Sequence, residues 1–206
     1  MVIRELKPSQ RVEGRWLAFL EDGSILRLGE NEVIDFALYT GKELNEEESA
    51  ALQDSARRSA LKGKAMELLS RKPQSRRELE RKLVQWEASE EEAAAICDRM
   101  EELGYLNDAA YAATVVRHYS AKGYGERKLR DELYRRGVPR DLWAAALKQA
   151  GSPEAAIDAF VAKKLAGKEP DRKELKKVSD ALARRGYHWN DISAALCRYG
   201  AECDDE

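Results

Sequence analysis

The chain repeats a nine-residue pattern at a fixed distance, and this repeat restricts the possible folds more than any other feature. Residues 129–137 read LRDELYRRG and residues 178–186 read VSDALARRG, an offset of 49 residues. In an earlier and weaker copy, Leu79 lies 50 residues before Leu129. A unit of this length cannot bury its apolar face alone, so stacked neighbours must bury it. The sequence therefore predicts a tandem array of three similar helical units.

Apolar residues spaced three and four apart predict three helices in each unit. In the second unit, the apolar stripes are Tyr111/Val115/Tyr119, Leu129/Leu133 and Trp143/Ala146/Leu147. Capping boxes that start at Ser75 and Ser89 mark helix beginnings. We expect a mainly α fold: three tandem three-helix repeats, at residues 60–107, 108–151 and 152–200, in an elongated, curved array.

The beginning of the chain carries the β signal. Asp22-Gly23 separates two apolar runs and predicts a type I′ hairpin in which Phe19 pairs with Leu26 and one face is apolar. Residues 32–39 predict a short helix that covers this face. We expect a small β-hairpin and helix module at residues 1–44, followed by a polar helical connector at residues 45–59.

The charge is unevenly distributed along the chain. Residues 60–200 contain 28 basic and 22 acidic side chains, whereas residues 1–59 contain 8 and 12. Residues 201–206 form an acidic tail with 4 carboxylates and no cation. The net positive charge of the repeats permits an anionic partner.

The sequence contains no recognisable catalytic or metal-binding constellation. There is no phosphate-binding loop, no HExxH motif, no nucleophile elbow and no CxxC pair. The first residues do not resemble a signal peptide, and no apolar run approaches the roughly 20 residues of a membrane span. We therefore expect a cytoplasmic protein that is not an enzyme and that needs no cofactor or metal.

Several short motifs, in this order and spacing, resemble the RecX family. Residues 104–112, GYLNDAAYA, are similar to the family's GYLDD-x-x-[FY]-A signature between its first and second units. Residues 125–138, with the pattern G-x-x-x-L-x-x-x-L-x-x-R-G-V, resemble the signature of the second unit, and residues 184–187, RRGY, that of the third. The resemblance covers nearly the whole chain.

Two positions depart from the family pattern. Asn107 stands where an aspartate is common, which keeps a capping oxygen. Residues 85–87, QWE, replace the arginine-glycine step in the first unit, which removes basic charge there. The first unit is therefore expected to be a weaker basic surface than the other two.

The resemblance implies a regulator of the RecA recombinase. It implies binding along the helical groove of RecA filaments on single-stranded DNA, with possible weak direct binding to DNA. It also implies modulation, with inhibition expected, of filament assembly, ATPase, strand-exchange and co-protease activities. We expect the chain to act as a monomer.

Basic residues around the middle helix of each unit are the candidate contacts. The apolar stripes commit the other helix face to the core, so most of these cations must point outward. The candidates are Arg76, Arg77, Arg81 and Lys82 in the first unit, Arg127, Lys128, Arg130, Arg135 and Arg136 in the second, and Lys173, Lys176, Lys177, Arg184 and Arg185 in the third, with Tyr124 and Tyr134 as exposed stacking residues. Such faces could meet acidic patches of RecA, DNA phosphates, or both.

Other interpretations of this pattern stay open. Three short helices with a basic middle helix also resemble helix-turn-helix units, so the chain could be a direct DNA-binding regulator. It could equally be a helical scaffold for another protein, with cations that only solubilise it. Carboxylates such as Glu126 and Glu132 can neutralise neighbouring cations, and arginines near a helix C-terminus are favoured by the helix dipole.

Overall fold

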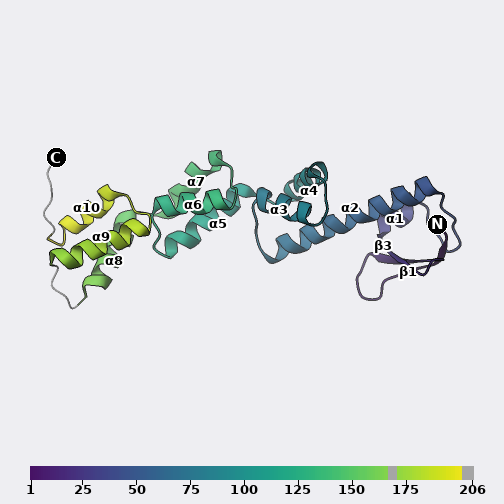
Figure 1. Cartoon of the computed structure of the whole chain (residues 1–206), viewed down its shortest axis with the longest axis horizontal. Helices are drawn as coiled ribbons and strands as arrows, with labels where there is room; N and C mark the ends of the chain where they lie inside the picture. The colour runs from purple at the N-terminus through teal and green to yellow at the C-terminus, as the bar shows by residue number, and fades with distance from the viewer. Residues whose placement is uncertain (167–170, 201–206) are drawn as a thin grey trace. The chain divides into compact units, whose positions relative to one another are not determined.

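The structure, a computed structural model, describes residues 1–166 and 171–200 of the 206-residue chain (Figure 1). The acidic tail predicted at residues 201–206 lies outside the described residues. The chain forms two compact units. The first comprises residues 1–72 and 82–105, and the second comprises residues 73–81 and the described residues from 106 onward.

The first unit begins with an antiparallel sheet of three strands, in the order β1-β2-β3. These are β1 (Ile3–Pro8), β2 (Arg15–Leu20) and β3 (Ile25–Gly29). The sequence predicted only the hairpin of β2 and β3. A register shift between Ile3 and Glu5 allows Ile3 and Leu6, three positions apart, both to contact the same core. Strand β1 therefore lacks the simple alternation from which a strand is recognised.

The predicted hairpin register is wrong by one residue. Phe19 pairs with Ile25, and Leu26 pairs with Ala18. A type I′ turn needs a positive φ at both central residues, but only the glycine of Asp22-Gly23 has one, at +84°. The loop is therefore three residues long, and this change turns β2 over relative to β3, so that Ala18 rather than Phe19 lies on the same face as Leu26 and Leu28. Ala18 and Leu28 are buried in the core, while Phe19 lies on the opposite face.

Helix α1 (Glu30–Asp35) begins earlier and ends earlier than the predicted helix at residues 32–39. Ala37 adopts a positive φ of 44°, which stops the helix, and Ile34 is 72% exposed. The main cover of the sheet is the long helix α2 (Glu46–Arg71), whose Leu52 and Ala56 are buried in the same cluster as the sheet residues. Residues 45–59, which the sequence predicted as a polar connector, thus also contribute to the N-terminal core.

A buried carboxylate joins α1 to α2. Glu32 accepts hydrogen bonds from the hydroxyl groups of Ser55 and Ser59 and from the backbone N–H of Gly29. Burial raises the pKa of Glu32, but these hydrogen bonds outweigh it and hold the pKa below its ordinary value. The carboxylate is therefore ionised at neutral pH and fixes the position of α1.

Helices α3 (Arg76–Gln85) and α4 (Glu90–Glu102) follow α2. The capping box predicted at Ser89 is present, since its hydroxyl accepts from the N–H of Glu92. The carboxylate of Glu92 also pairs with Arg57 and so ties α4 to α2. This hydrogen-bonded ion pair, followed by the capping bond from Ser89, lowers the pKa of Glu92 to about 2.

The second unit contains two further groups of helices. Helices α5 (Asp108–Ala121), α6 (Glu126–Arg135) and α7 (Trp143–Leu147) enclose one apolar cluster, which includes Val116, Leu129 and Leu133. Helices α8 (Pro153–Leu165), α9 (Arg172–Arg184) and α10 (Trp189–Cys197) enclose another, which includes Val161 and Leu182. The apolar stripes predicted for α5, α6 and α7 are confirmed, because their residues are either buried in the first cluster or packed against it.

Candidate interaction surface

The N-terminus of α6 meets the C-terminal end of α9 through backbone hydrogen bonds. The N–H of Gly125 donates to the carbonyl of Arg185 at 2.9 Å, and the N–H of Arg127 donates to the carbonyl of Gly186 at 3.1 Å. Free N–H groups at the start of one helix thus satisfy free carbonyls at the end of the next. The opposite ends of two helix dipoles also attract each other.

This joint requires glycine on both sides. A Cβ on Gly125 would lie 2.5 Å from the backbone of Gly186. A Cβ on Gly186 would lie 2.6 Å from the backbone nitrogen of Lys128, and Gly186 also has a φ of +88°. Only a residue without a side chain permits this approach. The glycine of the repeated Arg-Arg-Gly sequence is therefore a contact residue of the joint.

An equivalent joint links the N-terminus of α3 to the C-terminal end of α6. The hydroxyl of Ser75 donates to the carbonyl of Arg136. Gly137 has a φ of +69°, and a Cβ there would lie 2.5 Å from Cδ of Arg77. The two joints use corresponding residues of the repeat, so the middle helices follow one another by a repeated contact.

The second arginine of the first Arg-Arg-Gly sequence is an internal residue. Arg136 donates to the hydroxyl of Tyr111 at 2.6 Å and to that of Tyr119 at 3.4 Å. Carboxylates of Glu78 and Glu132 each lie 3.8 Å from its guanidinium group. Burial alone would lower the pKa of Arg136. The hydrogen bonds from its guanidinium group to the two tyrosines outweigh this effect and hold the pKa above its ordinary value, so Arg136 stays charged.

The tyrosine of this network is also perturbed. Burial, followed by the hydrogen bond to Glu78, raises the pKa of Tyr111 to about 12, although Arg136 opposes this rise. Tyr111 therefore remains a neutral donor to Glu78 and an acceptor from Arg136 at neutral pH. Arg136 holds a core network together, which corrects its prediction as an outward contact.

Arg185, at the corresponding position of the next repeat, is an internal tie of a different kind. Its guanidinium group donates to the carbonyls of Lys122 and Gly123 at 3.1 Å each, which caps the C-terminal end of α5. It also lies 4.7 Å from the ring centroid of Phe160 and 5.8 Å from that of Tyr124. Arg185 therefore fastens one repeat to the next and is not free to bind a partner.

Tyr124 is not an open stacking residue as predicted. Its ring is half-buried, with the Tyr119 ring 5.9 Å away on one side and Arg185 on another. Tyr134, by contrast, is 64% exposed and stays a candidate. The structure adds Trp189, which is 66% exposed at the start of α10. The sequence pattern around Trp189 gave no sign that its ring faces solvent.

Most outward cations of α6 already have a partner in the same unit. Arg130 pairs with Glu126 at 2.6 Å, and Arg135 pairs with Glu132 at 2.9 Å. Arg127 donates to the carbonyl of Ala183 at 3.1 Å. Lys128 is half-buried beside Gly186. The face of α6 is rich in basic residues, but its charge is largely neutralised or engaged.

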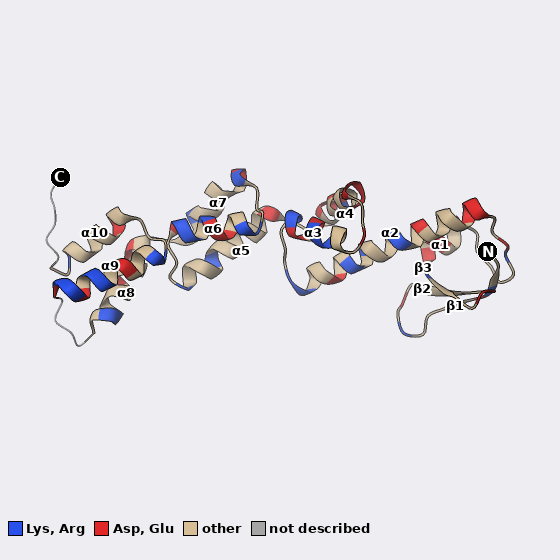
Figure 2. Ribbon diagram, in the orientation of Figure 1, with Lys and Arg blue, Asp and Glu red and all other residues tan. Residues whose placement is uncertain are grey.

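The cations of α9 are more available. Lys173, Lys176 and Arg184 are exposed and form no side-chain hydrogen bond or ion pair with any residue that the structure describes. Lys177 pairs with Glu174. Figure 2 shows Lys and Arg along α9, interrupted by few carboxylates. These three residues form the α9 basic face, which is the most accessible part of the predicted surface.

The basic residues of α3 are divided between structural and exposed positions. Arg76 pairs with Glu80 at 2.8 Å, and the side chain of Arg77 covers Gly137. Nε of Arg81 donates to the carbonyl of Arg77 at 3.3 Å. Lys82 is half-buried and belongs to the first unit. Arg77 and Arg81 keep exposed side chains, so this helix offers a smaller basic surface.

Two further findings restrict the chemistry of the described residues. Residues 1–166 and 171–200 contain no group of three or more His, Cys, Asp or Glu that could hold a metal ion. None of the helices described is both long enough and apolar enough to cross a membrane.

Comparison with known proteins identifies the family. The models for the first, second and third three-helix domains of RecX match residues 62–100, 107–147 and 153–196. A curated relative named Regulatory protein RecX, from Pseudomonas fluorescens, is 35% identical over 148 residues, which are 71% of this chain and 94% of the relative. The chain belongs to the RecX family. A RecX of Xanthomonas citri is 36% identical over 135 residues, 64% of this chain and 83% of that protein.

Solved RecX structures share the fold. One crystal structure titled regulatory protein RecX superimposes with a TM-score of 0.74 at 21% identity and covers 96% of this chain and 100% of its own. The structure of RecX from Lactobacillus salivarius gives a TM-score of 0.65 at 20% identity, and the match covers 69% of this chain and 96% of that protein. The predicted family and the mainly helical fold with three three-helix domains are confirmed. The sheet precedes the first matched family segment, which begins at residue 62.

Proposed function

We propose that this chain is a regulator of RecA that binds RecA filaments on single-stranded DNA and inhibits their assembly and activities. Its RecX relatives are named regulatory proteins, and none of the matched descriptions is that of an enzyme. Inhibition of the ATPase, strand-exchange and co-protease activities follows if the bound chain opposes filament growth. A RecA partner is a bacterial cytoplasmic protein, so the chain acts there, as a monomer.

The observation that carries this proposal is the α9 basic face on a helix that is joined rigidly to its neighbour. Exposed cations without an internal partner keep their charge available for phosphates or carboxylates. The joint between α9 and α6 uses backbone hydrogen bonds and glycine contacts, which allow little rotation. The joint therefore holds the exposed cations of α9 in a fixed relation to the neighbouring repeat, which suits a repetitive polymer more than a single small ligand.

The direct test adds the purified chain to RecA filaments on single-stranded DNA and follows ATP hydrolysis and filament length. We expect ATP hydrolysis to fall and filaments to shorten as the chain is added, with the effect saturating. A variant with Lys173→Ala, Lys176→Ala and Arg184→Ala serves as the matched control for the basic face. No change at saturating wild-type protein would reject the proposal.

The same preparation tests the two alternative functions. A direct DNA-binding regulator would retain one duplex sequence in preference to others without RecA. A helical scaffold for another protein would leave both RecA and DNA unaffected. We favour the RecA regulator because the models of all three RecX domains match the chain and its curated relatives are named Regulatory protein RecX.

A further inference from the structure

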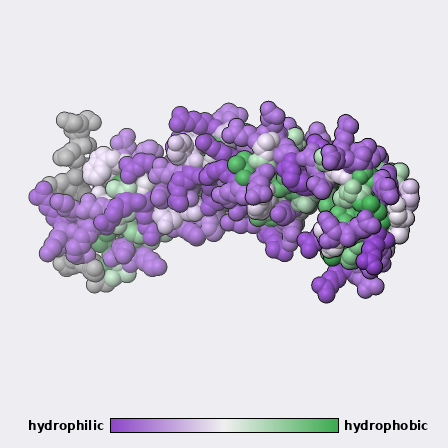
Figure 3. Space-filling model, turned by 45° about the vertical axis from the view of Figure 1, so that its right-hand side comes forward, coloured by the Kyte–Doolittle hydropathy of each residue, from purple (hydrophilic) through white to green (hydrophobic). Residues whose placement is uncertain are grey.

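The sheet of the first unit has an outward face that its core does not use. The register places Lys7, Leu17 and Arg27 in one row across the strands and Glu5, Phe19 and Ile25 in the next. None of these residues belongs to the cluster that packs against α2. Ile25 is 53% exposed. Figure 3 shows apolar residues visible among hydrophilic ones over the N-terminal module. The outward face thus combines an aromatic ring, apolar side chains and cations with one carboxylate, Glu5, which pairs with Lys7 at 3.0 Å.

A hollow of about 710 Å³ lies along this face and is strongly basic. The residues that line it include four cations, Lys7, Arg11, Arg15 and Arg27, and no carboxylate among the residues that the structure describes. Clustered like charges raise the local positive potential, and an apolar wall between them strengthens it. The hollow therefore favours an anion even though residues 1–59 are net negative.

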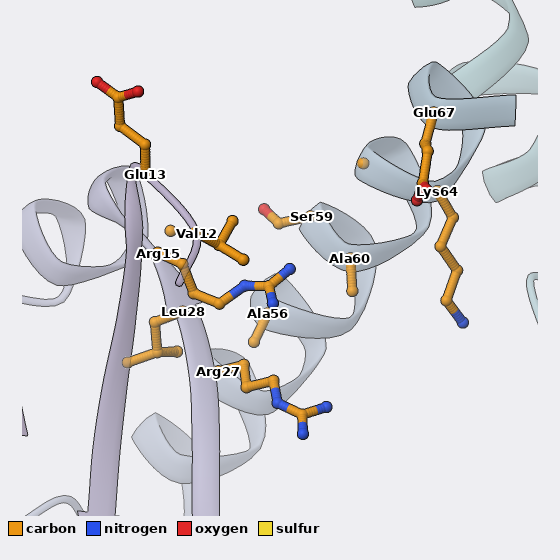
Figure 4. A pocket seen from close by; sticks show the side chains of 13 residues that line it. Val12, Glu13, Arg15, Arg27, Leu28, Ala56, Ser59, Ala60, Lys64 and Glu67 are labelled. Atoms are coloured by element: carbon orange, nitrogen blue, oxygen red, sulfur yellow. The ribbon is translucent and has the colours of Figure 1, made fainter. Parts of the chain in front are cut away.

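The basic surface continues around the edge of the sheet. A second hollow of about 420 Å³ shares Val12, Arg15 and Arg27 and extends to Lys64 and Glu67 on α2, of which Glu67 already pairs with Arg71. Figure 4 shows the side chains of Arg15 and Arg27 extending from neighbouring strands, while Glu13 points away from both. The two guanidinium groups are therefore available to both hollows and form the centre of a continuous basic track.

The arginines of this track differ from others in the same unit. The side chains of Arg11, Arg15 and Arg27 form no hydrogen bond or ion pair with any residue in the described part of the chain. On α2, by contrast, Arg58 pairs with Asp54 and Arg71 pairs with Glu67. A phosphate could therefore bind the arginines of the sheet without first displacing a carboxylate partner.

We propose that the outward face of the sheet binds single-stranded nucleic acid. Arg15 and Arg27 would bind phosphates, and Phe19 would provide a ring on which a base stacks. Nζ of Lys7 lies over this ring, 4.5 Å from its centroid, and pairs with Glu5 at 3.0 Å, so a stacking base would displace Lys7 from the ring. Sheets that carry aromatic rings and cations on one face are a general solution for unpaired strands. This site goes beyond the proposed function because it precedes the matched family segments and does not need RecA.

The test measures binding of the full chain to a fluorescently labelled oligothymidylate, without RecA, by anisotropy at several salt concentrations. The double variant Arg15→Ala/Arg27→Ala should bind about tenfold more weakly at low salt. The slope of log K against log salt concentration should become shallower by about 1.4, because each of the two lost phosphate contacts contributes roughly 0.7. Phe19→Leu keeps an apolar side chain but removes the ring, and it should weaken binding about fivefold.

The matched control is Arg58→Ala/Arg71→Ala, which removes two exposed but paired arginines of the same unit and should change the affinity less than twofold. Thermal melts identify any variant that fails to fold, and the Arg15 and Arg27 side chains are exposed, so these substitutions should leave the melting temperature unchanged. Equal weakening by the control, or wild-type affinity of the double variant, would overturn the site.

Equally tight, Arg15-dependent binding of polyglutamate would assign the face to an acidic protein instead. Inhibition of RecA by a double variant that no longer binds the oligonucleotide would leave the proposed function intact.

Discussion

Helices α6 and α9 derive from the same repeated pattern, yet they use their cations differently. In α6, Arg130 and Arg135 are paired with carboxylates of the same helix, and Arg136 is enclosed by tyrosines and carboxylates. In α9, Lys173, Lys176 and Arg184 have no partner among the described residues. Equal basic content in the sequence therefore does not mean equal charge available to a partner.

The comparison also separates the two arginines of each Arg-Arg-Gly sequence. The first arginine, Arg135 or Arg184, is exposed. The second, Arg136 or Arg185, forms internal hydrogen bonds, and the glycine forms the joint. One repeated sequence thus serves both surface charge and architecture, and a charge reversal of both arginines would disturb folding and binding together.

The largest expected effect is on the joint between α9 and α6. Gly186→Ala combines a positive φ with a clash against the backbone of Lys128, and it should reduce the free energy of unfolding by about 3 kcal/mol. Gly104→Ala is the matched control, because Gly104 follows α4 as Gly186 follows α9 and has a φ of +75° but no atom within 4 Å of the added Cβ, and it should lose only about 1 kcal/mol. Urea unfolding measures both. Equal losses would show that the close approach carries no energy.

The internal arginines should rank next. Arg136→Ala removes the cation that contacts Tyr111 and Glu78 and leaves Glu132 with Arg135 alone, and it should cost about 2 kcal/mol. Arg185→Ala leaves two carbonyls that water can reach at the end of α5 and should cost about 1 kcal/mol. The same urea titrations provide the values. A larger loss for Arg185 would reverse the difference inferred between the two networks.

The Tyr111 network should make stability sensitive to alkaline pH. A folded-state pKa of about 12 lies above the ordinary value of 10.0, so the contribution is complete below pH 10 and is lost as the pH rises through 12. We expect the free energy of unfolding to fall by about 1–2 kcal/mol across this interval, and Tyr111→Phe to remove this part of the fall. Urea unfolding of the wild-type chain and the Tyr111→Phe variant, measured between pH 9 and pH 11.5, tests this prediction. An identical pH dependence in the variant would contradict the assignment.

The smallest effects belong to the exposed arginines. Arg184→Ala should change the free energy of unfolding by less than about 0.5 kcal/mol, because Arg184 is exposed and has no described partner. Arg135→Ala should cost about 1 kcal/mol, because its carboxylate partner Glu132 is buried. Thermal melts are sufficient to measure this. A loss comparable to that of Arg136→Ala would remove the distinction between surface and architectural arginines.

The sequence predicted the helical units because their apolar stripes and capping residues are local features. The stripes around Leu129 and Leu182 and the capping box at Ser89 needed no knowledge of distant contacts. The hairpin register was missed because one residue of loop length decides it, and Asp22-Gly23 fits both a two-residue and a three-residue loop. Strand β1 was missed because an irregular register hides its apolar pattern.

The candidate surface was predicted less completely, because exposure depends on contacts between repeats. The sequence places Arg136 and Arg185 beside outward cations, but their partners Tyr111 and Lys122 lie far away along the chain. Tyr124 was assigned to the surface for the same reason. Only the folded repeats show which cations of a basic helix are free.

The measurement that tests this account most directly compares two variants in binding to RecA filaments on single-stranded DNA. One carries Lys173→Ala, Lys176→Ala and Arg184→Ala on α9, and the other carries Arg130→Ala and Arg135→Ala on α6. The α9 variant should bind about tenfold more weakly, at roughly 0.5 kcal/mol per free cation, and the paired α6 cations should cost less than threefold. A greater loss from the α6 variant, with both proteins folded, would contradict the claim that unpaired cations make the contact surface.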